Sequence, residues 1–166
     1  MSSHDRVRSH ERHHRDRQIQ ETVHDPYQER HKPAEPAVCP NCAVVFEHGR
    51  WQWLPRPAAA QEHLCPACRR VQDTYPAGYV TLSGGFLDEH RTELMQLVHN
   101  EETRAKQEHP LERIMQVAQD GGNTLVTTTD VHLARRIGEA LHHAYQGDLD
   151  IKYSKDEYLV RVSWSR

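Results

Sequence analysis

All four cysteines of the chain lie in two matching C-x2-C pairs, and this feature constrains the fold more than any other. The first pair is "CPNC" at residues 39–42, the second is "CPAC" at residues 65–68, and 22 residues separate them. Two residues between cysteines let one tight turn present both sulfurs to a single ion, and tetrahedral zinc accepts four thiolates. The pattern therefore predicts one structural Zn²⁺ site, closed to substrates because every position is filled. The predicted ligands are Cys39, Cys42, Cys65 and Cys68.

The segment between the two pairs is typical of a hairpin. "AVVF" (43–46) predicts a strand, "EHGR" (47–50) a turn, and "WQWL" (51–54) the returning strand. We therefore expect a zinc ribbon over residues 37–78, in which two knuckles enclose the metal. The alternative is redox chemistry at a C-x-x-C pair, which needs a cysteine at the start of a helix. Neither pair is followed by an obvious long helix.

Residues 1–36 form a compositionally biased tail. They hold seven Lys or Arg, seven Asp or Glu, and six of the 14 histidines, with almost no aliphatic side chains. Such a segment cannot offset its ordering entropy by burial, so we expect it to be disordered on its own. It is either a solvated tail without a partner or an arm that orders on nucleic acid. The arm would use Arg6, Arg8, Arg12, Arg15 and Arg17.

Residues 79–166 predict a second, larger unit of the α+β class. Its helices should cover one face of a mostly antiparallel sheet, in the order β-α-α-β-α-β-β. Hydrophobic periodicity and turn residues place the successive elements at 78–84, 85–109, 110–120, 123–129, 131–146, 148–154 and 158–165.

The sequence contains no signal for a membrane, for secretion or for catalysis. No run approaches the roughly 18 apolar residues of a membrane helix, and the N-terminus lacks the apolar core of a secretion signal. We expect a cytoplasmic protein, where a reducing environment disfavours disulfides. The glycine pairs in "LSGGF" and "DGGN" lack the phosphate-loop frame, and no nucleophile elbow occurs. We predict a non-enzymatic protein without a small-molecule substrate.

The chain resembles a known protein family. The paired "CPxC" motifs, "GYVTLSGGFLDEHRTEL" and "TLVTTTDVHLARRIGEALHHAYQGDLDIKYSKDEYLVRVSWSR" resemble short bacterial relatives of the large-ribosomal-subunit export adaptors. That family was first named for nonsense-mediated mRNA decay. The resemblance covers roughly residues 37–166, and it departs from the family because a second set of zinc knuckles is absent. It implies a ribosome or structured rRNA as the partner.

Several residues are candidates for contact with RNA. Arg50, Arg69 and Arg70 lie beside the predicted turn and the second cysteine pair, and arginine forks suit phosphate oxygens. Trp51 can stack on an unpaired base. The alternative is that Trp51 and Trp53 cover the small core of the ribbon.

The last predicted hairpin carries two further candidates, Lys152 and Arg161, which point away from its apolar face. Our predicted register places Arg161 opposite Asp150, so a cross-strand ion pair is the alternative to RNA contact.

The charge distribution keeps a second class of function open. The net charge is zero for residues 1–36, +1 for residues 37–78 and −4 for residues 79–166, whereas typical RNA-binding domains are strongly basic. Our first hypothesis is a zinc-binding ribosome or rRNA partner that acts in stress and hibernation or in assembly. The alternatives are a zinc-dependent protein-interaction adaptor, with ribosomal proteins among its partners, and a thiol–zinc redox sensor.

Overall fold

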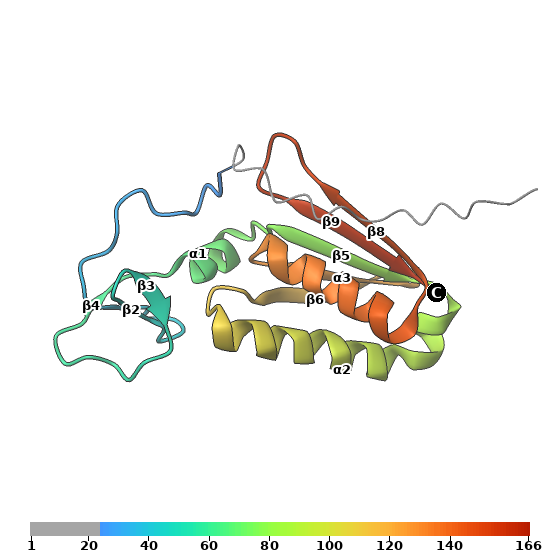
Figure 1. The fold of residues 1–166 in the computed structure, drawn as a ribbon, viewed down its shortest axis with the longest axis horizontal. Coiled ribbons are helices and arrows are strands. Elements are labelled where there is room, and N and C mark those ends of the chain that lie inside the picture. Colours follow the sequence, from blue (N-terminus) through green and yellow to red (C-terminus); the bar gives the residue numbers. More distant parts are fainter. Residues whose placement is uncertain (1–23) are drawn as a thin grey trace, which may run out of the picture.

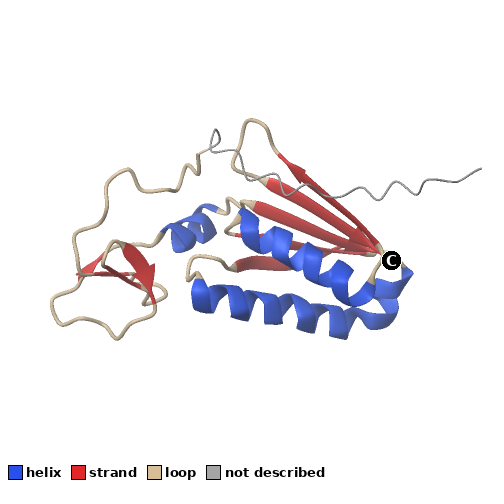
Figure 2. Ribbon diagram, viewed as in Figure 1, coloured by secondary structure: helices blue, strands red, loops and turns tan. Residues whose placement is uncertain are grey.

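The computed structural model describes residues 24–166, and it confirms the predicted α+β class. It contains three helices and two sheets, one of four strands and one of five (Figures 1 and 2). Among residues 24–166, no helix is both long enough and apolar enough to span a membrane. The predicted arm from Arg6 to Arg17 lies outside the described residues.

The first cysteine pair lies in the turn between two strands of the smaller sheet. The strands of this sheet lie in the order β3-β2-β1-β4. The strands are β1 (Ala37–Val38), β2 (Val45–Glu47), β3 (Arg50–Gln52) and β4 (Gln61–Glu62). The β2–β3 hairpin confirms the predicted turn: His48 and Gly49 both have positive φ, at 54° and 78°, as a two-residue turn between right-twisted strands requires.

The second cysteine pair is not a second knuckle, which corrects the predicted two-knuckle ribbon. Helix α1 (Pro66–Asp73) begins directly after Cys65, so Cys65 is its N-cap and Cys68 lies in its first turn. Pro66 explains this start, because proline is tolerated at the first helical position. We call residues 37–73 the metal module.

The larger unit is a five-stranded sheet with two long helices on one face. The strand order is β6-β7-β5-β9-β8, and only the β5–β9 pair is parallel. Figure 1 shows α2 and α3 side by side across the sheet. The elements are β5 (Gly78–Ser83), α2 (Gly85–Glu108), β6 (Ile114–Asp120), β7 (Asn123–Thr128), α3 (Val131–Tyr145), β8 (Asp148–Tyr153) and β9 (Val160–Ser165). We call residues 78–166 the sheet domain.

One predicted element of the sheet domain was wrong. The segment after Pro110 forms strand β6 and not a helix, so the order is β-α-β-β-α-β-β. Apolar residues at Ile114, Met115 and Ala118 fit a helical period, but so short a run is ambiguous. The pair Gly121-Gly122 decides the outcome, because it forms the two-residue turn that returns β6 onto β7.

The core of the sheet domain is apolar and continuous. Leu82 on β5, Leu94 on α2 and Leu141 on α3 are all fully buried. Trp164 on β9 is also fully buried, and its indole nitrogen donates a 2.7 Å hydrogen bond to the carbonyl oxygen of Gln146. Burial of these side chains fixes the sheet and helices as a rigid platform beside the metal module.

Candidate metal centre

The first cysteine pair is held by a tight turn after β1. The amide of Cys39 donates to the carbonyl of Val44, and the amide of Ala43 donates to the carbonyl of Cys39, each at 2.9 Å. Ala43 adopts a positive φ of 66° to complete this turn. The turn brings the Cys39 and Cys42 thiols to the same side of the backbone, as the C-x2-C spacing predicted.

The second pair is held by the N-terminus of α1. The amide of Cys68 donates to Cys65 Sγ at 3.4 Å, so the sulfur caps the helix. The amide of Cys65 donates in turn to Cys39 Sγ at 3.4 Å, which joins the two pairs. Helix N-termini favour negative charge, so this position supports thiolates.

The four sulfurs form one compact cluster. All four ligand atoms lie within 4.8 Å of one another, and Cys42 Sγ is 3.8 Å from Cys65 Sγ. Zinc–sulfur bonds of about 2.3 Å in a tetrahedron place the sulfurs about 3.8 Å apart. All four cysteines are free of disulfides. The cluster is therefore positioned to hold one metal ion, and four sulfurs fit a closed tetrahedral site.

An arginine from the sheet domain completes the surroundings of the sulfurs. Arg113, in the connection between α2 and β6, donates from one terminal nitrogen to Cys68 Sγ at 3.3 Å. Its other terminal nitrogen donates to Cys42 Sγ at 3.1 Å and lies 3.8 Å from Cys65 Sγ. The sequence analysis missed Arg113, because no local pattern marks a residue 45 positions from Cys68.

The surroundings of the thiols shift their pKa values in different directions. A hydrogen bond from the Cys65 thiol, supported by the Val44 amide and Arg113, lowers the pKa of Cys42 to about 4. The same hydrogen bond to Cys42, together with burial, raises the pKa of Cys65. Burial is the main cause of the raised pKa of Cys68. Cys42 Sγ is also the sulfur closest to the Arg113 guanidinium, at 3.1 Å.

Trp53 also bridges the metal module and the sheet domain. Its indole nitrogen donates a 2.8 Å hydrogen bond to the carbonyl oxygen of Lys106, near the end of α2. Its ring lies 5.7 Å from the Arg113 guanidinium carbon. Trp53 therefore contacts the sheet domain, and its side chain stays 40% exposed. The predicted alternative, in which it covers the ribbon core, does not describe this position.

Residues 24–36 run along the metal module and make defined contacts with it. We call them the strap. Glu35 accepts hydrogen bonds from the amides of His48 at 3.1 Å and Gly49 at 2.7 Å, which holds the β2–β3 turn. Glu29 also forms a hydrogen bond with the His63 ring. The sequence analysis had assigned these residues to the tail, because burial by distant partners leaves no local signal.

Arg70, predicted as an RNA contact, is instead a buried partner of the strap. It is 1% exposed and donates to Asp25 at 2.6 Å and to the carbonyl of Tyr75 at 2.9 Å. Its guanidinium also lies 4.2 Å from the centre of the Tyr27 ring. A buried cation needs such partners, and they occupy the donors that RNA phosphates would require.

The other predicted RNA contacts of the metal module remain accessible. Arg50 is exposed, and the Arg69 side chain is 41% exposed with Glu29 at 3.9 Å. Trp51 is half-buried, packing on Phe46 with ring centroids 5.2 Å apart. Arg50 and Trp51 are successive residues of β3, so their side chains leave the strand on opposite faces of the hairpin.

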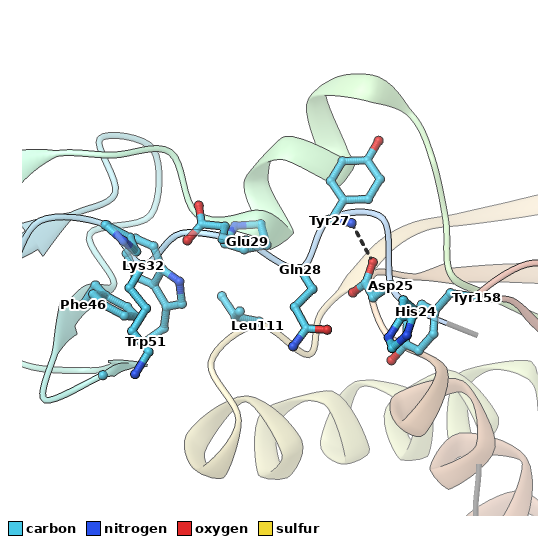
Figure 3. A pocket seen from close by; sticks show the side chains of 13 residues that line it. His24, Asp25, Tyr27, Gln28, Glu29, Lys32, Phe46, Trp51, Leu111 and Tyr158 are labelled. Carbon is cyan, nitrogen blue, oxygen red and sulfur yellow. Dashed lines mark hydrogen bonds between the residues drawn. The ribbon is translucent and has the colours of Figure 1, made fainter. Parts of the chain in front are cut away.

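Trp51 also lines an open cavity of about 640 Å³ between the strap and the rest of the chain. Figure 3 shows Lys32, Phe46 and Trp51 at one end of it, and Asp25 and Tyr158 toward the other. Lys32 is exposed and its Nζ lies close to Gly49: the Cβ of a side chain substituted at Gly49 would be 3.1 Å from it. The cavity therefore combines aromatic walls with a cation near its mouth.

Lys152 and Arg161 lie on the sheet face opposite the helices. The register pairs Lys152 with Arg161 and Asp150 with Ser163, which corrects the predicted opposition of Arg161 and Asp150. Arg161 is exposed and lies 4.7 Å over the Tyr79 ring, while Lys152 Nζ is 3.4 Å from Asp150. The two cations are neighbours across the strands.

The chain was also compared with known proteins. No family model matches it, and neither the curated proteins nor the solved structures gave a significant match.

Proposed function

We propose that this protein is a non-enzymatic zinc-binding protein that associates with the ribosome or with structured rRNA through its metal module. The observation that carries the proposal is the group of accessible side chains at the β2–β3 hairpin. Arg50 and Lys32 are exposed cations beside Gly49, and Trp51 presents a ring to the neighbouring cavity. Cations suit phosphate oxygens and aromatic rings suit unpaired bases, so the group fits folded RNA with exposed nucleotides.

We infer that the metal is Zn²⁺. A set of four sulfur ligands is the usual donor set of structural zinc sites. The resident ion would fix the turn after β1 against the start of α1. Because β3 and the Arg69 side chain extend from these two elements, the ion would position the proposed RNA contacts without taking part in any reaction.

Arg69 extends this proposed contact surface along α1, and Arg161 with Lys152 forms a separate, smaller one. Arg70 has no part in it, since Asp25 and Tyr75 occupy its donors. RNA bound at one patch of the metal module is compatible with a sheet domain that carries 10 Lys or Arg against 14 Asp or Glu. The acidic sheet domain would project away from the phosphates.

The same acidic surface favours a second candidate function, a zinc-dependent protein adaptor. Residues 79–166 have a net charge of −4, and a basic ribosomal protein would complement them. The two functions differ in where the contact lies. RNA binding uses the metal module, and the adaptor uses the sheet domain. In either case we propose a role in ribosome assembly or in the hibernation of subunits under stress.

Sucrose-gradient sedimentation of the tagged full chain tests the proposal. Lysates of growing and starved cells would be compared, with and without RNase. We expect the protein to migrate with a ribosomal particle, and RNase to abolish this migration. Migration only at the top of every gradient would contradict both ribosomal functions.

Matched variants then separate the RNA contact from the protein contact. The double variant Arg50→Gln and Arg69→Gln should reduce association, while the control pair Arg104→Gln and Lys155→Gln removes the same charge elsewhere. Binding to purified subunits should weaken steeply with salt if several phosphates are contacted. Equal binding of the two double variants, with little salt dependence, would favour the protein adaptor.

A further inference from the structure

Arg113 is the residue that joins the metal centre to the sheet domain. Its side chain reaches three of the four sulfurs from outside the metal module, and the residue is 9% exposed. Its Nε donates to the carbonyl of Pro110 at 2.8 Å, so every part of the guanidinium is engaged. Within residues 24–166, no carboxylate forms an ion pair with it.

The backbone of Arg113 is held by reciprocal hydrogen bonds with Thr129. Its amide donates to Thr129 Oγ1 at 2.9 Å, and the Thr129 amide donates back to the Arg113 carbonyl at 2.9 Å. Thr129 Oγ1 also donates to the carbonyl of Leu111 at 2.6 Å. Because Thr129 lies directly after β7, these bonds anchor the Arg113 backbone at the C-terminal end of that strand.

Both groups in this contact, the thiolate cluster and the guanidinium, are charged, and each requires a counter-charge. Four thiolates around a divalent cation keep a net negative charge, and a buried guanidinium without a counter-charge is strongly disfavoured. The guanidinium therefore offsets part of this negative charge, and the thiolates supply the counter-charge that the guanidinium needs. Contacts made to metal ligands by outer residues typically change metal affinity by about 10- to 100-fold.

We propose that Arg113 couples metal loading of the cysteine cluster to the docking of the sheet domain. The residue acts on the ligands and never on the ion itself, so it is a positioning residue. Coupling between two events is reciprocal: if the metal secures the contact with Arg113, then Arg113 must secure the metal by the same factor. This inference is independent of the proposed RNA partner.

The first arm of the test measures metal affinity of the full chain by competition with a chromophoric zinc chelator. Arg113→Met keeps the length of the side chain and removes its donors, and Arg113→Lys restores one charge. Arg104→Met is the matched control, because the Arg104 side chain is 67% exposed and its ion pair is with Glu101 on the same helix. We expect Arg113→Met to lose about 10- to 100-fold in zinc affinity, Arg113→Lys less, and the control less than about twofold.

The second arm measures amide hydrogen exchange, which reports the order of the Arg113–Thr129 connection that carries the contact with the sulfurs. Removing zinc from the wild-type protein should speed exchange at Thr129 and Arg113, while Val80 and Val162 in the sheet stay protected. In Arg113→Met these amides should exchange fast already with zinc bound, and zinc removal should add little. Protection of Val80 and Val162 confirms that each variant is folded.

The proposal would be overturned by either of two results. One is an Arg113→Met protein that binds zinc as tightly as the wild type. The other is a wild-type protein whose Thr129 amide is equally protected with and without zinc. If Arg113→Met does not fold, the wild-type exchange experiment and Arg113→Lys still decide the question.

Discussion

The metal module and the sheet domain reach a defined structure by different means. The buried cluster of the metal module consists of Cys39, Val44, Cys65, Ala67 and Cys68, so three of its five members are metal ligands. The sheet domain instead buries a continuous set of large apolar side chains on α2, α3 and three strands. The metal module is too small to bury enough apolar surface to fold by itself, and a metal held by the cysteines would supply the missing free energy.

The comparison also explains why buried arginine side chains contact the metal module. Arg70 and Arg113 are both buried in or beside the metal module, and each has its donors occupied. In the sheet domain the buried side chains are mostly apolar, and the buried Glu101 carboxylate pairs with Arg104 and Arg136. The lesson is that the metal module depends on charge balance, whereas the sheet domain depends on packing.

Metal removal should have the largest effect, and it should affect the two regions differently. Chelation of zinc under reducing conditions should unfold the metal module, because zinc binding contributes on the order of 10 kcal/mol to the folding of small zinc domains. The sheet domain should persist, because its core lies apart from the sulfurs. Two-dimensional amide spectra check this: resonances of β1–β3 should collapse while those of β5 and β9 remain. A simultaneous collapse of both sets would refute the distinction.

Truncation of a core side chain should produce the opposite pattern. Leu141→Ala removes a fully buried side chain from α3 and should lower the free energy of unfolding of the sheet domain by about 2–5 kcal/mol. Zinc affinity should be unchanged, since α3 does not reach the cysteines. Urea unfolding and chelator competition measure the two quantities. Leu54→Ala, at a 37% exposed position, is the control and should alter neither.

The strap should respond to loss of its ion pair with Arg70. Asp25→Asn leaves the buried guanidinium without its counter-charge and should cost about 1–3 kcal/mol. The expected result is faster tryptic cleavage after Arg30, which precedes His31. Asp73→Asn is the control, because it keeps an acceptor for the Tyr27 hydroxyl on the exposed side of α1. Equal cleavage of both variants and the wild type would show that the Asp25 contact does not hold the strap.

The smallest expected effect concerns pH. Burial, with a contribution from the nearby Asp130 charge, raises the pKa of Glu112 from 4.5 to about 7. The folded state therefore binds this proton more tightly than the unfolded state, so the stability it contributes at low pH is lost as pH rises from 4.5 to about 7. Glu112→Gln should flatten this part of the stability–pH profile, as measured by urea unfolding. A slope equal to that of the wild type would contradict the assignment.

The features predicted well from sequence are those that depend on local spacing. The four ligands follow from C-x2-C pairs, and the β2–β3 hairpin follows from Gly49 between two strand-like runs. Residues 114–120 were misassigned because their period fits a helix locally, while pairing with β7 makes them a strand. In such short segments, tertiary pairing overrides the local pattern.

The features that sequence reasoning missed depend on distant partners. Arg70 resembles a phosphate-binding residue next to Cys68, and only its contact with Asp25, 45 positions away, reveals a structural role. Arg113 lies in a polar-looking loop with no cysteine nearby in the sequence. The composition of residues 24–36 predicts disorder, yet Glu35 and Asp25 find partners in the metal module. Burial of charge by long-range pairing has no periodic signature.

X-ray absorption spectroscopy at the zinc edge, combined with elemental analysis of protein purified under reducing conditions, tests the central claim most directly. The account predicts one zinc ion per chain with a single shell of four sulfurs at about 2.3 Å. Protein that contains no zinc, or zinc with nitrogen or oxygen ligands in its first shell, would contradict a metal centre built by Cys39, Cys42, Cys65 and Cys68.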